Sequence, residues 1–533
     1  MLANQDGDRQ IPSVISFKED QQFHGVEART QLIRNASNTI ANFRDLLSTS
    51  YARTDPTSSH NSAHVLEKDG FPIFRISTAR EGAEESEEMD VSVSKAVQIH
   101  LGRLKDSAED FLGRPVTGAV LTVPTDFSEE QQQALREAAM LARLNVVQVI
   151  HEPIAAILAY STLEHSEEND NILVADFGGL RSDVAVVSSR GGLYTMLATS
   201  HDLELGGAQL DDALAEFFAK EFQKKNKVDM RTNARAMTKL RLEAESAKKT
   251  LSTSTTATTG VDSLDHGIDF HFAVNRLRFE MVTKKYVDQM LHLVEQVVKK
   301  ANLDVLQISK VILSGGQSHM PKLASRVAAL FPETTQILSP AFLLTAIDPS
   351  ELCARGAALQ GSIIPKSDKT EIEHSIHPVV TSAPHLSKAI GYMRPDGTLN
   401  MLMDANTPLP ARKSSVFSAP PEGGNVVIRI AEGREEIITS TPQKLTNGTD
   451  HKAEKEDSDT ESDEDEDEPA EIRELRLGVE NVLGEFVMKD VKPKAKLELT
   501  ITIDADLNSN FTLREVGGSG GIRGQIGGVD VDT

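Results

Sequence analysis

The chain has 533 residues, a formal net charge of −24 and one cysteine, Cys353. Its length exceeds what a single hydrophobic core accommodates, so we expect two or three domains. One cysteine permits no internal disulfide, and the negative charge disfavours direct binding to nucleic acid. Residues 1–11 are polar and acidic, unlike a signal peptide, and no apolar run could span a bilayer. We therefore expect a soluble, intracellular protein that acts without a membrane.

Much of the negative charge lies in one short segment. Between Glu454 and Glu468 there are eleven Asp or Glu residues and one Lys, which places about −10 in that segment. Such a composition offers almost nothing apolar to bury, so we predict a disordered insertion at 445–471. The rest of the chain is only mildly acidic.

Strands alternate with helices in the first part of the chain, which favours an α/β architecture. Ser128 and Gln131 form a capping box that opens a helix reaching to about Leu144. A second helix is expected at 152–160. Short aliphatic runs predict the strands, which we place at 120–123, 146–150, 172–175, 184–187 and 194–198.

Paired glycines twice follow a predicted strand. Gly178 and Gly179 come after 172–175, and Gly315 and Gly316 come after 311–313. Because glycine has no Cβ and tolerates positive φ, such turns let backbone N–H groups approach an anion closely. Helices are predicted beyond the second pair, from about Pro321 and again at 351–364.

The pattern changes after residue 364. A polar segment at 365–386 predicts a linker, and 394–397 predicts a turn between two short strands. Apolar residues then alternate with polar ones from Leu497 to Ile503, which indicates a half-buried strand of an antiparallel sheet. The glycine-rich end, 517–533, is expected to be a flexible tail.

These segments resemble the DnaK-type (heat shock protein 70) family, from Asn4 to about Val516. Each motif alone is weak, but they follow one another in the family's order. They are Asp6-Gly7-Asp8-Arg9 with Ile11-Pro12-Ser13, Asn38-Thr39, Val123-Pro124, His151-Glu152-Pro153, Asp176-Phe177-Gly178-Gly179, Leu205-Gly206-Gly207, Gly315-Gly316, Asn406-Thr407-Pro408-Leu409-Pro410 and Glu432-Gly433.

The resemblance implies an actin-like ATPase domain of duplicated ribonuclease-H-like lobes at 1–364. A linker at 365–386 and a small antiparallel β-sandwich domain of the peptide-binding type at 387–516 would follow. The family begins with two more strands that carry a first phosphate loop, so we expect the nucleotide-binding domain to be incomplete at its N-terminus.

Within the family, the sequence of residues 177–183 and the short β domain without a helical lid are most similar to those of the Ssz-type subunit of the fungal ribosome-associated complex. That resemblance implies a zuotin-like J-domain partner, an indirect association with the ribosome, and cooperation with a second, active heat shock protein 70 chaperone.

The resemblance also implies a site for ATP or ADP. Glu245, Lys248, Lys249 and Ser252 match the family's adenosine-contacting helix, and the spacing of three and four residues places Glu245, Lys248 and Ser252 on one helical face. A solvated charged helix would show the same spacing. The expected phosphate contacts are the backbones of Gly178, Gly179, Gly206 and Gly207, and Gly315 and Gly316 are also expected to bind the nucleotide.

Asp176 and Asp183 match positions near a hydrated Mg²⁺, which prefers carboxylate ligands, and Glu152 matches a position linked to the attacking water. This sequence differs from the family at two positions that take part in catalysis. Arg44 replaces the catalytic lysine, and Arg181 replaces a threonine. A guanidinium reproduces neither a compact ammonium nor a hydroxyl. We therefore expect no working catalytic residue, with Glu152, Asp176, Arg44 and Arg181 as vestiges.

Two further departures fall near the adenine and the linker. Gln317 and His319 replace the serine and the arginine that follow the second glycine pair, and Gln132 replaces an arginine that relays nucleotide state. The favoured hypothesis is thus a cochaperone subunit with little or no ATP hydrolysis. The alternative is an autonomous ATP-dependent folding chaperone.

Overall fold

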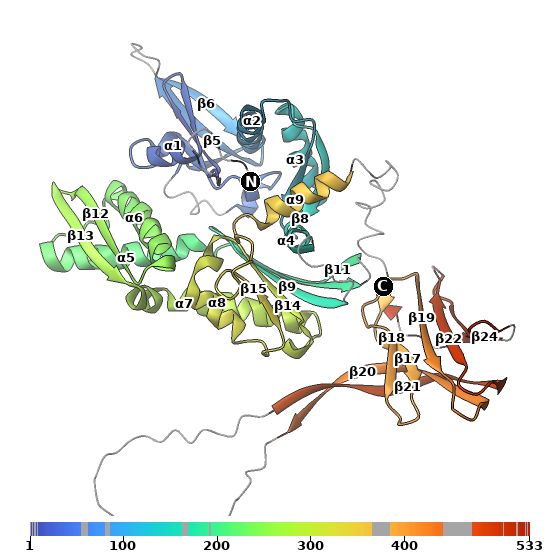
Figure 1. Cartoon of the computed structure of the whole chain (residues 1–533). Helices are drawn as coiled ribbons and strands as arrows, with labels where there is room; N and C mark the ends of the chain where they lie inside the picture. The colour runs from blue at the N-terminus through green and yellow to red at the C-terminus, as the bar shows by residue number, and fades with distance from the viewer. Residues whose placement is uncertain are drawn as a thin grey trace, which may run out of the picture. The chain divides into compact units, whose positions relative to one another are not determined.

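The computed structural model describes residues 9–54, 62–79, 86–161, 169–190, 193–364, 384–440, 472–504, 506–518 and 521–527, with a few single positions near the two ends. The chain divides into two compact units, 1–381 and 382–533 (Figure 1). The predicted linker falls at this division, but its residues 365–383 lie outside the described ones, as does the predicted acidic insertion. In the described part of the chain, no helix is both long and apolar enough to cross a membrane.

A five-stranded sheet is the centre of the first unit, and its strand order is β11-β10-β9-β14-β15 (Figure 1). Strands β9 and β10 are antiparallel, whereas β14 runs parallel to both β9 and β15. The strands predicted at 172–175, 184–187, 194–198 and 311–313 are confirmed within this sheet. Its strands are β9 (Asp170–Phe177), β10 (Ser182–Arg190), β11 (Leu193–Asp202), β14 (Lys310–Ser314) and β15 (Gln336–Leu338).

Both faces of this sheet are buried, because alternate residues of β9 enter two different cores. Leu173 and Ala175 pack into a large core with α5 (Gly207–Asn226), α6 (Ala234–Thr253), α7 (Arg276–Lys300) and α8 (Pro321–Ala328). Ile172 and Val174 pack into the opposite core with α4 (Glu152–Ser161) and α9 (Leu352–Ile363). Strands covered by helices on both faces read as continuous aliphatic runs, which is why the sequence revealed them.

The N-terminal part of the first unit has smaller sheets and its own core. Ile15, Ile40 and Phe74 are completely buried there against α2 (Val93–Leu112). One sheet has the order β2-β1-β3, one has β4-β5-β6, and β7 pairs with β8 in parallel. The strands are β1 (Val14–Lys18), β2 (Gln21–His24), β3 (Thr39–Ala41), β4 (Val65–Lys68), β5 (Phe71–Ala79), β6 (Ser86–Ser92), β7 (Ala119–Val123) and β8 (Val146–His151).

Three local features of this unit complete the fold around the site. The capping box of Ser128 and Gln131 is present at α3 (Glu129–Leu141), and the helix ends before Arg143, which adopts a positive φ of 57°. Helix α1 (Gly25–Gln31) packs beside β1. A two-stranded hairpin of β12 (Thr256–Asp265) and β13 (Ile268–Asn275) packs along α6.

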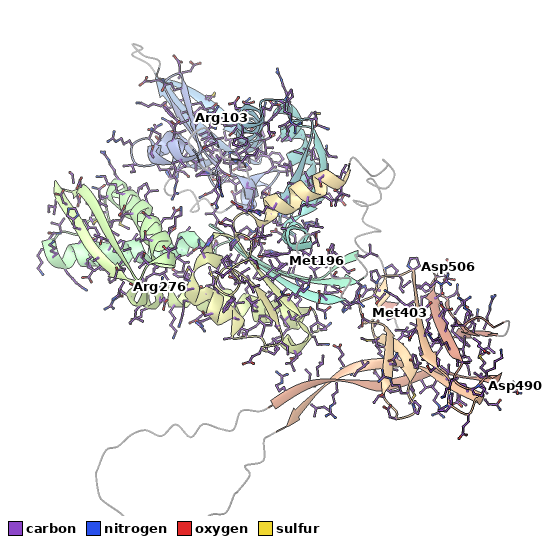
Figure 2. All side chains as sticks on the ribbon, in the orientation of Figure 1. Arg103, Met196, Arg276, Met403, Asp490 and Asp506 are labelled. Atoms are coloured by element: carbon purple, nitrogen blue, oxygen red, sulfur yellow. The ribbon has the colours of Figure 1, made fainter. Side chains whose placement is uncertain are left out.

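The second unit contains two four-stranded antiparallel sheets, β18-β17-β20-β21 and β19-β22-β23-β24, that share one apolar core. Met403 of the first sheet, labelled in Figure 2, lies in that core with residues of the second sheet. Leu497, Leu499, Ile501 and Ile503 are completely buried, which confirms the predicted alternation. The strands are β16 (His385–Leu386), β17 (Ala389–Met393), β18 (Leu399–Met403), β19 (Ala411–Ser418), β20 (Gly424–Ser440), β21 (Ile472–Val491), β22 (Lys496–Ile503), β23 (Ser509–Glu515), β24 (Gly521–Ile526) and β25 (Val531–Asp532).

The sequence predicted a flexible tail at 517–533, and the structure corrects this prediction, because part of the segment forms paired strands. Strand β24 pairs with β23, and β25 pairs with β16. Glycine suits this strand sterically: a Cβ on Gly524 would lie 2.5 Å from the ring of Phe511. Gly524 therefore reflects close packing against an aromatic ring.

Candidate functional site

The carboxylates at the end of β9 are brought together by strand register. Asp176 lies opposite Asp183 on β10 and opposite Ser314 on β14. The Ser314 hydroxyl donates a hydrogen bond of 2.9 Å to Asp176 Oδ2. Burial raises the pKa of Asp176 to about 6, although the hydrogen bond from Ser314 opposes that shift. The first predicted glycine pair follows this strand directly, so the site lies at one edge of the central sheet.

Glu152 and Arg44 meet at the same place from two other elements. Glu152 begins α4, and Arg44 lies in a 3-10 turn at Arg44–Leu46. Arg44 donates from Nη1 to Glu152 Oε1 at 3.3 Å and from Nε to Asp45 Oδ1 at 2.8 Å. Burial raises the pKa of Glu152 to about 7, while the charge of Arg44 acts in the opposite direction. A carboxyl with such a pKa could exchange a proton near neutral pH.

Arg181 forms the most extensive ionic contacts of the site. We call it, with Asp45, Asp126 and Asp183, the Arg181 cluster. Its Nε donates to Asp183 Oδ2 at 2.7 Å, and its Nη2 donates to Asp183 Oδ1 at 2.5 Å and to Asp126 Oδ1 at 2.8 Å. Its Nη1 lies 3.6 Å from Asp45 Oδ2. The Arg181 side chain is only 5% exposed, so the guanidinium is enclosed by carboxylates.

The two predicted glycine pairs at the phosphate side lie against each other. Gly207 N–H donates to the Gly178 carbonyl at 3.0 Å, and Ala208 N–H donates to the Gly179 carbonyl at 2.8 Å. Gly178 N–H donates to the Arg181 carbonyl, and Gly206 N–H donates to the Gln209 side chain. The amides of Gly178, Gly206 and Gly207 thus already have partners inside the protein.

The predicted adenosine helix, α6, faces this glycine contact. Lys248 is buried and donates to the Gly207 carbonyl at 3.1 Å and to Asp211 Oδ2 at 2.9 Å. Glu245 pairs with Arg29 of α1 and with Lys249, whose Nζ lies 2.9 Å from Glu245 Oε1. We call Lys248, Asp211, Glu245, Arg29 and Lys249 the Lys248 cluster.

Burial controls the charges of the Lys248 cluster. Burial raises the pKa of Asp211 to about 6 and lowers the pKa of Lys248, while each partner's charge opposes these shifts. The predicted residue Ser252 donates its hydroxyl to the Lys248 carbonyl at 3.2 Å. Sequence therefore located the helix, but the partners Asp211 and Arg29 carried no signal that we recognised.

The second glycine pair also adjoins the site. Gly315 has a φ of 82°, and a Cβ there would lie 2.4 Å from the Phe177 carbonyl oxygen, so only glycine fits. Gln317 is buried over Gly207, where a Cβ would lie 2.2 Å from its Nε2. His319 Nε2 lies 3.2 Å from Asp348 Oδ1. The structure thus places Gly315 against Phe177 and Gln317 against Gly207.

Three further groups, near Asp176 and Arg181, were also missed from the sequence. Asp126 follows β7, and Asp45 follows Arg44 directly. The general rule that ligand-binding side chains gather at the carboxyl ends of strands could have indicated Asp126. Cys353 of α9 lies with its Sγ 4.0 Å from Asp176 Oδ2, and nothing in its sequence context indicated this contact.

The expected Mg²⁺ ligands do not fit a metal in this arrangement. Both carboxylate oxygens of Asp183 accept hydrogen bonds from Arg181, and Asp176 Oδ2 accepts one from Ser314. A hydrated divalent ion needs carboxylate oxygens that are free to accept its water or to ligate it directly. Asp183 is therefore unavailable as a metal ligand in this arrangement.

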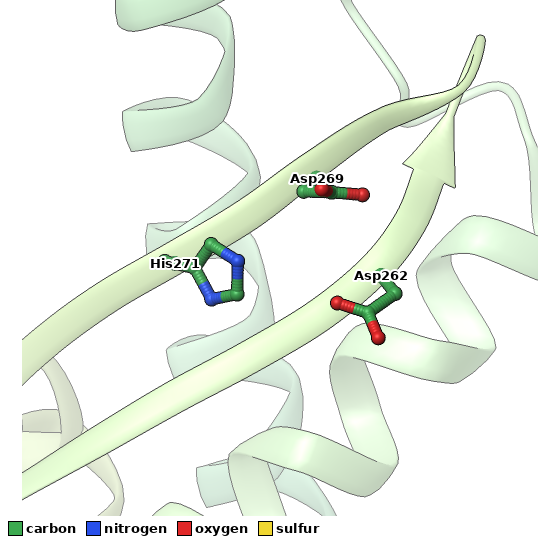
Figure 3. Close-up of side chains that lie close together, drawn as sticks. All are labelled: Asp262, Asp269 and His271. Carbon is green, nitrogen blue, oxygen red and sulfur yellow. The ribbon is translucent and has the colours of Figure 1, made fainter.

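A different group of possible ligands lies on the β12–β13 hairpin. Asp262, Asp269 and His271 offer atoms within 4.8 Å of one another (Figure 3). All three side chains are exposed, and Asp269 already accepts a hydrogen bond of 2.7 Å from the Ser263 amide. Exposed acidic groups of this kind are ordinary surface features, so this group supports no functional assignment.

Fold and site together define an α/β unit with a charged site at the edge of its central sheet, followed by a β unit. The Hsp70 protein family model matches residues 1–449. The chain therefore belongs to the heat shock protein 70 family.

Relatives extend this likeness over almost the whole chain. A heat shock protein 70 homolog of Schizosaccharomyces pombe is 42% identical over 522 residues, which cover 98% of this chain and 90% of the relative. The ribosome-associated complex subunit SSZ1 of Saccharomyces cerevisiae is 40% identical over 504 residues, covering 94% and 92%. Heat shock 70 kDa protein 14-A of Xenopus laevis is 35% identical over 437 residues, covering 81% and 83%. The prediction of a family member of the Ssz type is confirmed.

Proposed function

We propose that this protein is a chaperone subunit that binds a J-domain partner of the zuotin kind and hydrolyses little or no ATP. In this role it supports folding of emerging chains by a second, active heat shock protein 70 chaperone. The cytoplasm, at the ribosome, is the corresponding location. Support for the partnership comes from the likeness to a protein named as a subunit of the ribosome-associated complex.

The proposed architecture is an actin-like ATPase domain followed by a β-sandwich of the peptide-binding type. Supporting it are the helix-covered central sheet of the first unit and the two sheets with a common core in the second. ATP or ADP would lie between the glycine pairs and α6, with Glu245, Lys248, Lys249 and Ser252 on the adenosine side. For a phosphate to reach the amides of Gly178 and Gly207, their present hydrogen bonds would have to open.

One observation carries the proposal. Arg44 and Arg181 stand at positions where the family has catalytic groups, and each is paired with carboxylates of the protein. Arg44 is bound to Glu152 and Asp45, and Arg181 is bound to Asp183 and Asp126. Neither guanidinium can act as a hydroxyl, and both are committed to carboxylates. Losing one well-placed electrostatic contributor costs roughly 10²–10³ in rate, so two losses would remove about 10⁴–10⁶.

A steady-state ATPase measurement on the purified chain tests the absence of turnover. We expect phosphate release no faster than in a buffer blank. Glu152→Gln is the matched control, because it removes the carboxyl that the family links to the attacking water. Phosphate release above the blank that Glu152→Gln abolishes would contradict the proposal and favour an autonomous ATP-driven chaperone.

Co-purification tests the partnership. We expect a zuotin-like J-domain protein, co-expressed with the chain, to remain bound to the Lys249→Ala variant, because Lys249 belongs to the adenosine side. Changing Val379 and Val380 to Asp should release it, because the linker, freed from relaying nucleotide state, is our candidate surface. Release by Lys249→Ala combined with retention by the linker variant would show that the partner surface lies elsewhere.

A further inference from the structure

The carboxylates of the Arg181 cluster come from three distant segments of the first unit. Asp45 follows β3, Asp126 follows β7, and Asp183 lies on β10. Their side chains are 31%, 24% and 12% exposed, whereas that of Arg181 is 5% exposed. Three converging carboxylates would repel one another without a cation between them. The cation in this structure is a side chain of the protein itself.

Arginine is well suited to this position. Its guanidinium remains charged at any physiological pH, and its planar fork matches a carboxylate in two parallel hydrogen bonds, as seen with Asp183. The remaining donors reach Asp126 and Asp45 on the other side. Since a guanidinium offers five N–H donors in one plane, one side chain connects all three segments.

The same arrangement disfavours a divalent ion. An ion near Asp183 would have to displace two charge-assisted hydrogen bonds and would then lie beside a buried positive charge. Asp176 is a poor replacement, because its Oδ2 already accepts a hydrogen bond from Ser314 and the positive charges of Arg44 and Arg181 act on the same carboxylate. The residues that resemble a metal site are therefore satisfied without a metal.

We propose that the Arg181 guanidinium is a built-in cation that occupies the carboxylate site in place of a divalent metal ion. The three segments are then held together whether or not Mg²⁺ is present. This inference does not depend on the partner, on the ribosome or on nucleotide binding, so it can fail while the proposed function stands.

Arg181→Thr tests the inference as a gain of function, with Mn²⁺ alone as the probe and the loss of the free-ion electron paramagnetic resonance signal as the readout. Threonine removes the Arg181 charge from Asp126 and Asp183, while Asp45 keeps its hydrogen bond from Arg44. We expect Mn²⁺ to bind Arg181→Thr at least about a hundredfold more tightly than the same position in the unmodified chain, because a unit charge a few ångströms away is removed.

Two controls separate this site from the rest of an acidic protein. The acidic run at 454–468 will take up some Mn²⁺ in every variant, so the measured quantity is the binding that Asp183→Asn removes from Arg181→Thr. Arg75→Thr is the matched control, because Arg75 also lies between carboxylates, Asp90 and Glu88, but on the exposed sheet β4-β5-β6. We expect no added Mn²⁺ binding in Arg75→Thr.

Either of two results would overturn the inference. One is Mn²⁺ binding to the unmodified chain that Asp183→Asn abolishes, and this measurement needs only a folded parent protein. The other is a folded Arg181→Thr variant whose Mn²⁺ binding equals that of Arg181→Lys, which keeps a positive charge in the cluster. Should Arg181→Thr not fold, recovery of its melting transition in Mn²⁺ is the expected result, and unfolding in both Mn²⁺ and chelator counts against the proposal.

Discussion

The two units of the molecule differ in how many charged side chains they bury. Among the described residues, the first unit buries six charged side chains, whereas the second unit buries only Glu432. The six are Asp170, Arg181, Arg190, Lys248, Asp265 and Glu351. Two of them, Arg181 and Lys248, are the centres of the clusters that form the candidate site. The second unit is held instead by an apolar core to which both of its sheets contribute.

This difference matters because buried charges and buried apolar groups fail in different ways. A buried ion pair adds little net stability compared with apolar packing, but removing one partner leaves an unpaired charge at high cost. Removing buried methyl groups costs transfer free energy and leaves a cavity. The first unit should therefore respond to single charge changes and to pH, and the second should respond mainly to changes in side-chain volume.

The largest effect is expected for Lys248→Met, which leaves Asp211 buried without its ammonium partner. We expect a loss of about 3–5 kcal/mol in the free energy of unfolding of the first unit. The loss should be smaller at pH 5, because a protonated Asp211 no longer needs the cation. Urea titration followed by circular dichroism measures it.

Lys249→Met is the matched control for Lys248→Met. Lys249 is the neighbouring residue on α6 and also forms an ion pair, but its side chain is 68% exposed. An exposed pair contributes at most about 1 kcal/mol. Equal losses in the two variants would mean that Lys248 stabilises the helix generally and not through Asp211.

The next effect tests the second unit. Leu499 is completely buried between the sheets, so Leu499→Ala should lower the free energy of unfolding of this unit by about 3 kcal/mol at every pH from 5 to 8. Hydrogen exchange resolved by mass spectrometry would assign the loss to residues 384–527. Val416→Ala on the neighbouring strand is the control, because Val416 is 55% exposed and should change stability by less than about 0.5 kcal/mol. A strongly pH-dependent loss would break the comparison.

A smaller effect concerns Glu152, whose pKa is raised to about 7 by burial. The folded state then holds this proton more tightly than the unfolded state does, so the contribution of Glu152 to stability falls as pH rises from about 4.5 to about 7. In Glu152→Gln no charge forms. Its stability relative to the parent should therefore improve by up to about 2 kcal/mol between pH 5 and pH 8.

Thermal melts of the parent and Glu152→Gln across this pH range provide the measurement. Glu129→Gln, an exposed glutamate in the first turn of α3, is the control and should give parallel curves. If the relative stability of Glu152→Gln instead falls with rising pH, the ion pair with Arg44 outweighs the cost of burying the carboxylate.

Sequence predicted the strands that are covered on both faces, because a run such as 172–175 is aliphatic throughout. It did not predict the exposed hairpin β12–β13 or the strands β4 to β6, whose residues alternate weakly with polar ones. For the site, it located Glu152, Asp176 and α6 through short motifs. The partners that decide their charges, Asp126, Asp211 and Arg29, lie far away in the sequence and have no motif of their own.

The smallest effect is expected in the acidic run of the second unit. Strand β20 ends at Ser440 and its partner β21 begins at Ile472, so 31 residues connect them. Residues 457–468 contain no apolar side chain. Deleting these twelve leaves 19 residues to close the loop, and the lower closure entropy should stabilise the hairpin by about 0.4 kcal/mol. At low salt the removal of like charges should add to this gain.

Melting curves of the deletion variant at low and high salt test both effects. Replacement of 457–468 by a glycine-serine segment of equal length is the control for charge alone. A decrease of more than about 1 kcal/mol in the free energy of unfolding would mean that the acidic run stabilises the folded second unit. Charged residues would then contribute to the stability of both units.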